Sequence, residues 1–245
     1  MDILRVKNLT KKFSQQDGIY NISFSIKQGR LVGLIGPNGS GKTTTLRCIL
    51  NLIRPDTGRV HVESYDLTDN DPKAKARVSY VPEMPSLYDD LTVLEHLKFI
   101  AMAYEVAPDI AKQRWESLLR RFELWDKRND IPTNFSKGMK QKVMIACSLI
   151  HDASVFLVDE PFMGLDPRAS KMFKDILTDL KSKNKGILMA THILDTAEKL
   201  CDEYILLYKG SIRAMGTIEQ LREASALGPH ASLEDIFIKL TEDIN

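Results

Sequence analysis

A glycine-rich segment of the chain has the residue types and spacing of a phosphate-binding loop. Residues 36–43 read GPNGSGKT and match the pattern G-x-x-x-x-G-K-[ST]. The glycines let backbone N–H groups converge on a phosphate in front of a helix N-terminus. We expect Lys42 to reach the β- and γ-phosphates of a nucleotide and the Thr43 hydroxyl to bind Mg²⁺. The alternative is a glycine-rich turn that carries an incidental lysine.

A pair of carboxylates follows a short apolar run later in the chain. Residues 155–158 read VFLV, and Asp159 and Glu160 come directly after them. A buried strand does not end in two carboxylates without a cation or a reaction for them to serve. We expect Asp159 to hold Mg²⁺ through water and Glu160 to polarise an attacking water. The alternative is an ordinary acidic turn before Pro161, and beside a phosphate loop it is the weaker one. Together the two motifs predict nucleotide hydrolysis.

Short apolar runs and helical patterns alternate around these motifs. The runs 31–35, 155–158, 187–190 and 204–208 are typical of buried strands, and 44–52, 169–181 and 193–200 are typical of helices. This alternation predicts a mainly parallel α/β sheet, with the phosphate loop between a strand and a helix. Residues 22–26 instead alternate apolar and polar side chains, and 4–6 begin a similar strand, so the chain opens with half-buried β structure.

The middle and the end of the chain show helical patterns only. Between residues 91 and 151 we expect helices at 93–104, 109–122 and 137–151, which form a helical lobe that interrupts the α/β core. From residue 228 to 245 we expect a packed C-terminal helix. Its apolar side would consist of Leu233, Ile236, Phe237 and Leu240.

Composition limits the classes of function. The 245 residues include 34 Lys and Arg and 33 Asp and Glu, so the net charge of +1 gives no reason to expect nonspecific nucleic-acid or anionic-lipid binding. Cys48, Cys147 and Cys201 are far apart, as free thiols in a reducing compartment would be. No run reaches the ~18 apolar residues of a membrane span, and the start lacks the apolar stretch of a signal peptide. We therefore expect a cytosolic chain that reaches a membrane only through a partner.

With these motifs in this order, the sequence resembles the ABC ATPases over nearly its whole length. Residues 135–141 read FSKGMKQ and look like the family signature, usually LSGGQ, a short strand upstream of Asp159. The resemblance implies an α/β P-loop NTPase fold of the ABC type, with a mainly parallel core, an N-terminal antiparallel β part and an inserted helical subdomain at about 84–151. The ABC ATPase domain would cover residues 1–228, followed by a C-terminal helix at 229–245.

The resemblance also implies a head-to-tail dimer in which each signature closes on the γ-phosphate of ATP held by the other subunit. The Ser136 hydroxyl and the Gly138 N–H, at the start of a helix, have the chemistry of an anion site. The alternative for Ser136 is a plain helix N-cap. Lys137 and Met139 depart from the usual residues, and no role is assigned to the extra charge of Lys137.

Four further positions correspond to functional positions of the family, three with a matching residue and one, Glu83, with a different residue. Asp166, in GLDP at 164–167, resembles the Asp that helps shape the partner's site, although this sequence is also a common turn. His192 resembles the histidine that hydrogen-bonds the γ-phosphate. Phe13 lies where an aromatic ring stacks on adenine, with core packing as the alternative and acceptance of GTP left open. Glu83 replaces the usual Gln and can still bind Mg²⁺.

The expected site therefore contains three groups of residues. The catalytic residues are Lys42, Glu160 and His192, and the metal ligands are Thr43, Glu83 and Asp159. The residues that bind the nucleotide are Phe13, Gly36, Pro37, Asn38, Gly39, Ser40, Gly41, Lys42, Thr43, Thr44, Ser136, Gly138, Met139 and Asp166.

The function implied by the resemblance is that of an ATP-hydrolysing motor subunit at the cytoplasmic face of a membrane, bound to separate permease subunits. Residues 83–98 lie where the family receives a coupling helix, and Leu87, Tyr88 and Leu91 either form that contact or pin the lobe to the core. The motifs are similar to those of drug, antibiotic-resistance and lipid exporters. The expected lack of the long regulatory domain of many sugar importers also favours export.

Two other functions remain as alternatives, and a third, a P-loop GTPase, is discounted. A soluble ABC protein acting on ribosomes or DNA usually has two cassettes or long coiled coils, whereas this chain has one complete cassette. A P-loop GTPase needs the pattern NKxD, and residues 184–187 read NKGI. A regulatory adaptor with a weakened ATPase is favoured only by the altered signature and Glu83. The sequence does not name the transported substrate or decide between a homodimer and a heterodimer.

Overall fold

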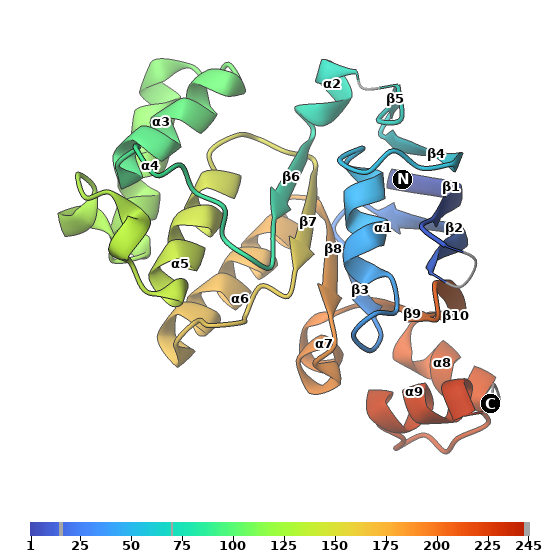
Figure 1. Ribbon diagram of the computed structural model, residues 1–245. Helices are drawn as coiled ribbons and strands as arrows, with labels where there is room; N and C mark the ends of the chain where they lie inside the picture. Colours follow the sequence, from blue (N-terminus) through green and yellow to red (C-terminus); the bar gives the residue numbers. More distant parts are fainter. Residues whose placement is uncertain (15–16, 70, 243–245) are drawn as a thin grey trace.

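The computed structural model describes residues 1–14, 17–69 and 71–242, which form two sheets with helices around them (Figure 1). The first sheet is antiparallel and has the strand order β2-β1-β4-β5. Its strands are β1 (Asp2–Lys12), β2 (Gly18–Lys27), β4 (Thr57–Val62) and β5 (Tyr65–Asp66). The predicted β structure at the start of the chain is thus confirmed.

The second sheet has the strand order β10-β9-β3-β8-β7-β6 and is parallel except at β10. Its strands are β3 (Leu31–Ile35), β6 (Val78–Val81), β7 (Val155–Asp159), β8 (Gly186–Thr191), β9 (Glu203–Tyr208) and β10 (Ser211–Gly216). Each residue of β3, β7 and β8 is buried, as continuous apolar runs between two covered faces should be. All four predicted core strands are confirmed.

The helices that alternate with these strands are α1 (Lys42–Ile49), α2 (Pro72–Lys75), α6 (Pro167–Ser182) and α7 (Leu194–Leu200). The prediction for the first helix, 44–52, was wrong at both ends. The helix begins at Lys42 because Gly41 adopts a left-handed conformation that turns the phosphate loop directly into it. It ends at Ile49 because Asn51 is also left-handed, with φ of 55°.

Between β6 and β7 the chain forms three longer helices: α3 (Val93–Ala103), α4 (Pro108–Arg121) and α5 (Lys137–Ser148). Figure 1 shows them gathered at one side of the molecule, and we call them the helical lobe. Thr92 and Glu95 form a capping box that fixes the start of α3. The third helix is shorter than the predicted 137–151, because the chain turns away after Ser148 and His151 stacks on Tyr104 with ring centroids 3.8 Å apart.

Alternate residues of the parallel sheet face two different cores. Val32, Leu34 and Leu157 pack toward α1 and the antiparallel sheet. Leu31 and Phe156 face the opposite way and pack with the helical lobe and α6. The sheet is thus covered on both faces, and its carboxyl edge carries the loops in which both sequence motifs lie.

The chain ends in α8 (Ile218–Ser225) and α9 (Leu233–Glu242), which pack beside β9 and α7. Leu233 and Ile236 are fully buried there, with Phe237 and Leu240 partly buried beside them, so the predicted apolar side of the last helix is confirmed. The Leu233 N–H also donates to the Glu198 carboxylate at 3.0 Å. Among the described residues, no helix combines the length and apolar character needed to cross a membrane.

We expect Ile236→Ala to lower the free energy of unfolding by about 2–4 kcal/mol, because truncation leaves a cavity at a fully buried site. Ile238 lies two residues further along α9 and is 46% exposed, so Ile238→Ala should change stability by no more than about 0.5 kcal/mol. Urea unfolding of both variants measures the difference. Equal losses would mean that α9 does not dock through the Leu233 and Ile236 side.

Candidate active site

The phosphate loop joins the buried end of β3 to the start of α1, as predicted. A side chain at Gly36 would collide with the Leu207 carbonyl, and Gly39 and Gly41 have φ of 78° and 103°. Residues with a Cβ rarely adopt such angles, so the spacing of these glycines is a requirement of the backbone. The loop therefore curls in front of the α1 N-terminus, where N–H groups and the helix dipole favour an anion.

Lys42 is buried and turns its ammonium group back toward the loop that precedes it. Its Nζ donates to the carbonyls of Gly36 at 2.8 Å and Pro37 at 3.1 Å, and lies 3.9 Å from Glu160 Oε1. Burial lowers the pKa of Lys42, and Glu160, Asp159 and Glu83 oppose this effect. The cation is thus held where three carboxylates converge.

Glu160 accepts hydrogen bonds from two neighbouring residues at the end of β8. Its Oε2 accepts from the Thr191 hydroxyl at 2.9 Å, and its Oε1 lies 2.8 Å from the His192 N–H and 2.7 Å from His192 Nδ1. Because a carboxylate only accepts, Nδ1 must carry the proton and Nε2 faces elsewhere. The backbone of Glu160 is left-handed, with φ of 42°, an uncommon conformation that is concentrated at functional sites.

Asp159, the last residue of β7, is fully buried, and neither of its carboxylate oxygens has a hydrogen-bond partner among the described residues. Burial raises its pKa from 3.8 to about 6, while the nearby Thr43 hydroxyl lowers it and Glu83 and Glu160 raise it further. An unpaired buried carboxylate beside a hydroxyl and a second carboxylate is the chemistry of a site for a hard cation. Within the described residues, however, no group of three or more His, Cys, Asp or Glu could hold a metal by itself.

Lys42, Glu160 and His192 line a cavity of about 460 Å³, whereas the buried Asp159 is not part of its wall. The expected residues found in its wall are Asn38, Gly39, Gly41, Lys42, Thr43, Thr44, Glu83, Glu160 and His192. The wall also contains Asp17, Gly18 and Met163, which the sequence analysis missed. The dipeptide Asp17-Gly18 is a turn signal that could have drawn attention to this loop.

The remaining expected residues lie outside this wall. Phe13 is 53% exposed and lines a separate cavity with Lys12, Ser14 and Tyr20. The Ser136 hydroxyl accepts from the Met139 N–H at 3.3 Å and so caps the N-terminus of α5. The alternative role of Ser136 as a helix N-cap is therefore present in the structure. Ser136, Gly138 and Met139 of the signature thus lie outside the wall of the phosphate cavity.

Gly138 has a packing reason of its own. A side chain at this position would lie 2.5 Å from the Gly164 carbonyl, so the start of α5 packs directly on the backbone of the 164–167 turn. Lys142 of the same helix pairs with Asp166 at 3.0 Å, and Asp166 also caps α6 through the Ala169 N–H at 2.8 Å. The signature helix and the Asp166 turn therefore form one packed unit.

Comparison with known proteins identifies the family to which the chain is similar. Residues 19–163 match the family described as ABC transporter. The chain is 38% identical to the ABC-type transporter ATP-binding protein EcsA of Bacillus subtilis (strain 168), over 99% of this chain and 98% of that protein. It is also 36% identical to the Nod factor export ATP-binding protein I of Ralstonia nicotianae, over 89% of this chain and 68% of that protein.

Solved structures agree over the same length. The structure of an ATP-binding subunit of an ABC transporter superposes with a TM-score of 0.93 at 39% identity and covers 98% of this chain and 99% of that one. A dimeric, post-hydrolysis ATP-binding cassette bound to ADP and Pi has a TM-score of 0.79 at 26% identity and covers 88% and 98% of the two chains. The predicted fold class is thereby confirmed.

The raised pKa of Asp159 makes a prediction about stability. The native state binds a proton more tightly than the unfolded chain, so the free energy of unfolding falls as the pH rises from about 4 to 6 and stays lower above that. Asp159→Asn removes the buried charge, and we expect it to be more stable than the wild type at pH 7.5 by about 1–3 kcal/mol. Near pH 4 the two proteins should have similar stability. Urea unfolding in EDTA at both pH values measures the difference.

Asp152→Asn is the matched control. A hydrogen bond from Lys185 lowers the pKa of Asp152, so removal of this charge should leave stability unchanged or reduce it at pH 7.5. If the wild type and Asp159→Asn had the same free energy of unfolding at both pH values, burial of the Asp159 carboxylate would not destabilise the protein.

Proposed function

The chain belongs to the ABC transporter family as one of its ATP-binding subunits, and from this premise we propose that it drives export by hydrolysing ATP. The observation that carries hydrolysis is the contact of Glu160 with His192 at 2.7 Å and with Lys42 at 3.9 Å. These side chains meet in the wall of a cavity whose other residues come from the phosphate loop. An anion-binding loop, a buried cation and an oriented carboxylate together support attack of water on a terminal phosphate. The direction, export, is supported by the similarity to the Nod factor export ATP-binding protein I.

Each side chain has a role in this proposal. Lys42 exchanges its carbonyl contacts for the β- and γ-phosphates of ATP. Glu160 polarises the attacking water, and its bonds from Thr191 and His192 hold the carboxylate in one orientation. His192 donates its Nδ1–H to Glu160, and it donates to the γ-phosphate through Nε2 only when both ring nitrogens carry a proton, because phosphate oxygens are acceptors. We propose that Phe13 stacks on the base.

The proposed Mg²⁺ site adjoins this cavity, because Thr43 and Glu83 line its wall and both influence the buried Asp159 carboxylate. We propose that Thr43, Asp159 and Glu83 hold Mg²⁺, because Asp159 offers two buried oxygens that have no other partner among the described residues. Few protein ligands are required, since Mg²⁺ at such sites is held largely by phosphate oxygens and water. When bound, the ion neutralises charge on the transferred phosphate. Glu83 supplies a negative charge where the family's Gln supplies none, while Lys42 remains to balance the cluster.

A second ATPase subunit completes the proposed site. Ser136, Gly138 and Met139 are outside the wall of the phosphate cavity, so a γ-phosphate bound there meets the signature of a partner in a head-to-tail dimer. Asp166 would lie at the same interface, because it is joined to the signature helix through Lys142. The dimeric cassette among the similar structures supports formation of a dimer.

The membrane partner is proposed to dock on the helical lobe. Tyr88 and Phe99 are 57% and 44% exposed and pack edge to face with centroids 5.4 Å apart. His96 Nε2 accepts from the Tyr88 N–H at 2.9 Å and anchors this aromatic pair to α3. Leu87 and Leu91 are partly buried, and Leu87 packs into the lobe core, which favours the pinning role for that residue. The proposed location is therefore the cytoplasmic face of a membrane.

Glu160→Gln keeps the shape of the side chain but removes the base. We expect steady-state ATP hydrolysis to fall at least about 100-fold while ATP binding persists. Glu223→Gln, an exposed change on α8, should leave the rate unaltered. A wild-type chain that binds ATP without turnover would instead support the regulatory adaptor, and full activity of Glu160→Gln would assign the base elsewhere.

When the chain is purified from its native membranes in mild detergent, we expect a polytopic membrane protein to co-purify in stoichiometric amount. Mass spectrometry identifies this protein. Tyr88→Asp and Phe99→Asp should each release the chain from membranes, because a charge in a desolvated contact is costly. Ile110→Asp is the control, since Ile110 is 47% exposed on α4 and outside the aromatic pair. Recovery of ribosomal proteins or DNA without a membrane protein would favour the soluble alternative.

A further inference from the structure

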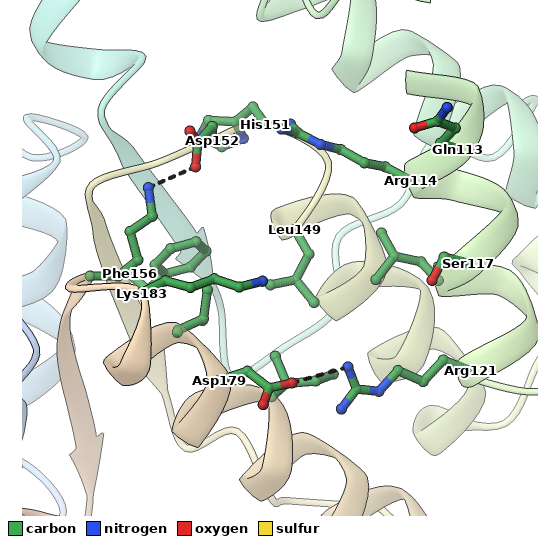
Figure 2. Close-up of a pocket in the computed structure, with 14 residues that line it drawn as sticks. Gln113, Arg114, Ser117, Arg121, Leu149, His151, Asp152, Phe156, Asp179 and Lys183 are labelled. Carbon is green, nitrogen blue, oxygen red and sulfur yellow. Dashed lines mark hydrogen bonds and ion pairs between the residues drawn. The ribbon is translucent and has the colours of Figure 1, made fainter. Parts of the chain in front are cut away.

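A second cavity, of about 340 Å³, lies between α4 of the helical lobe and α6 of the core (Figure 2). Its wall is completed by Leu149, His151 and Asp152, which follow α5, by Phe156 of β7, and by Lys183 and Lys185, which precede β8. The segments after α5 and before β8 lie before the amino ends of β7 and β8, whereas the phosphate loop and Glu160 follow the carboxyl ends of β3 and β7. The two cavities thus lie at opposite edges of the sheet, and their described walls share no residue.

The inner wall of this cavity is apolar. It consists of Leu118, Leu149, Phe156, Ile176 and Leu180. Phe156 is a buried residue of β7, so the cavity reaches down to the sheet itself. A volume of this size with an apolar floor and a polar rim is within the range of small-molecule sites, which is roughly 300–1,000 Å³.

The rim carries more positive than negative charge. Its two carboxylates are already paired, Asp152 with Lys185 at 2.6 Å and Asp179 with Arg121 at 3.5 Å. Two further cations, Arg114 and Lys183, have no carboxylate partner within the described parts of the chain. Arg114 donates one N–H to the Ile150 carbonyl at 2.7 Å, which fixes its guanidinium group and leaves its other donors available. Figure 2 shows the Lys183 side chain extended along the cavity.

The buried histidine of the wall does not alter this balance. Burial lowers the pKa of His151, and Arg114 and Lys185 act in the same direction. Its Nε2 lies 3.3 Å from the Val78 carbonyl, and its ring stacks on Tyr104. At neutral pH His151 is therefore an uncharged part of the wall, and the surplus charge comes from Arg114 and Lys183.

We propose that this cavity binds a small organic anion, whose aromatic or aliphatic body lies on the Phe156 side and whose carboxylate, phosphate or sulfonate is attracted by Lys183 and Arg114. An apolar floor favours the body, and two unpaired cations favour the charge. Because α4 and α6 both line the cavity, the occupant bridges the helical lobe and the core.

Two fluorescent probes that differ by one charged group test the proposal. The anion 8-anilinonaphthalene-1-sulfonate carries a sulfonate that the neutral N-phenyl-1-naphthylamine lacks. The wild type should bind the anion in a saturable manner and more tightly than the neutral probe. Ser117→Trp places an indole at the mouth of the cavity and should weaken both probes while leaving ATP binding intact.

Lys183→Glu should weaken the anionic probe about fivefold and leave the neutral probe unchanged, as expected for one partly exposed charge contact. Lys171→Glu makes the same charge change at an exposed position of α6 outside the cavity and should alter neither affinity. If Lys183→Glu and Lys171→Glu lost the same affinity for the anionic probe, the effect would be due to net charge and not to the cavity. That result, or equal affinity of the wild type for both probes, would overturn the proposal.

Competition identifies the source of the anion. Displacement of the anionic probe by 1-naphthoate, and not by laurate, would indicate a compact aromatic acid, and the reverse would indicate a fatty acyl chain. Either result supports the proposal, and failure of both to displace the probe would refute it.

Discussion

The site depends on the need to keep the buried carboxylate of Glu160 neutralised and hydrogen-bonded. A buried charge without partners would destabilise the fold by several kcal/mol. Glu160 avoids this cost by accepting from Thr191 and His192 and by lying 3.9 Å from Lys42. Lys42 follows β3, and Thr191 and His192 lie at the end of β8. The Glu160 carboxylate, which follows β7, therefore joins three separate parts of the chain. The same contacts that make its burial tolerable also orient it, and orientation is what a base for water requires.

Strand order makes this convergence available. β8 lies between β3 and β7, and the three strands are parallel, so the phosphate loop, the acidic pair and His192 emerge side by side at one edge. Asp159 pairs in register with Ala190, which places Glu160 beside Thr191. A shift of one residue in this register would turn Glu160 away from His192. The geometry of the site is therefore a property of the sheet, and the loops supply its chemistry.

The sequence was informative where function is encoded in adjacent residues. The phosphate loop, the acidic pair and the core strands could be predicted because each is a local pattern with its own physical reason. The contact between Glu160 and His192 could not be derived locally, because it spans 32 residues and depends on which strands are neighbours. Helix ends were misplaced where a left-handed Asn51 or the stacking of His151 overrode the helical pattern. The cavity between α4 and α6 was also invisible, since its charges lie on residues 114–185 and only folding gathers them.

The signature illustrates how a motif can satisfy two demands at once. Gly138 is needed inside this chain because the Gly164 carbonyl occupies the space a side chain would fill. Lys142 and Asp166 reinforce that contact, and Gln141 extends it by donating to the Pro82 carbonyl at 3.4 Å, next to Glu83. The start of α5 is thus fixed both to the turn before α6 and to the segment that brings Glu83 to the phosphate cavity. These contacts join the start of α5 to the segments that carry Glu83 and Asp166. An occupant between α4 and α6 would act on the same lobe from its other side.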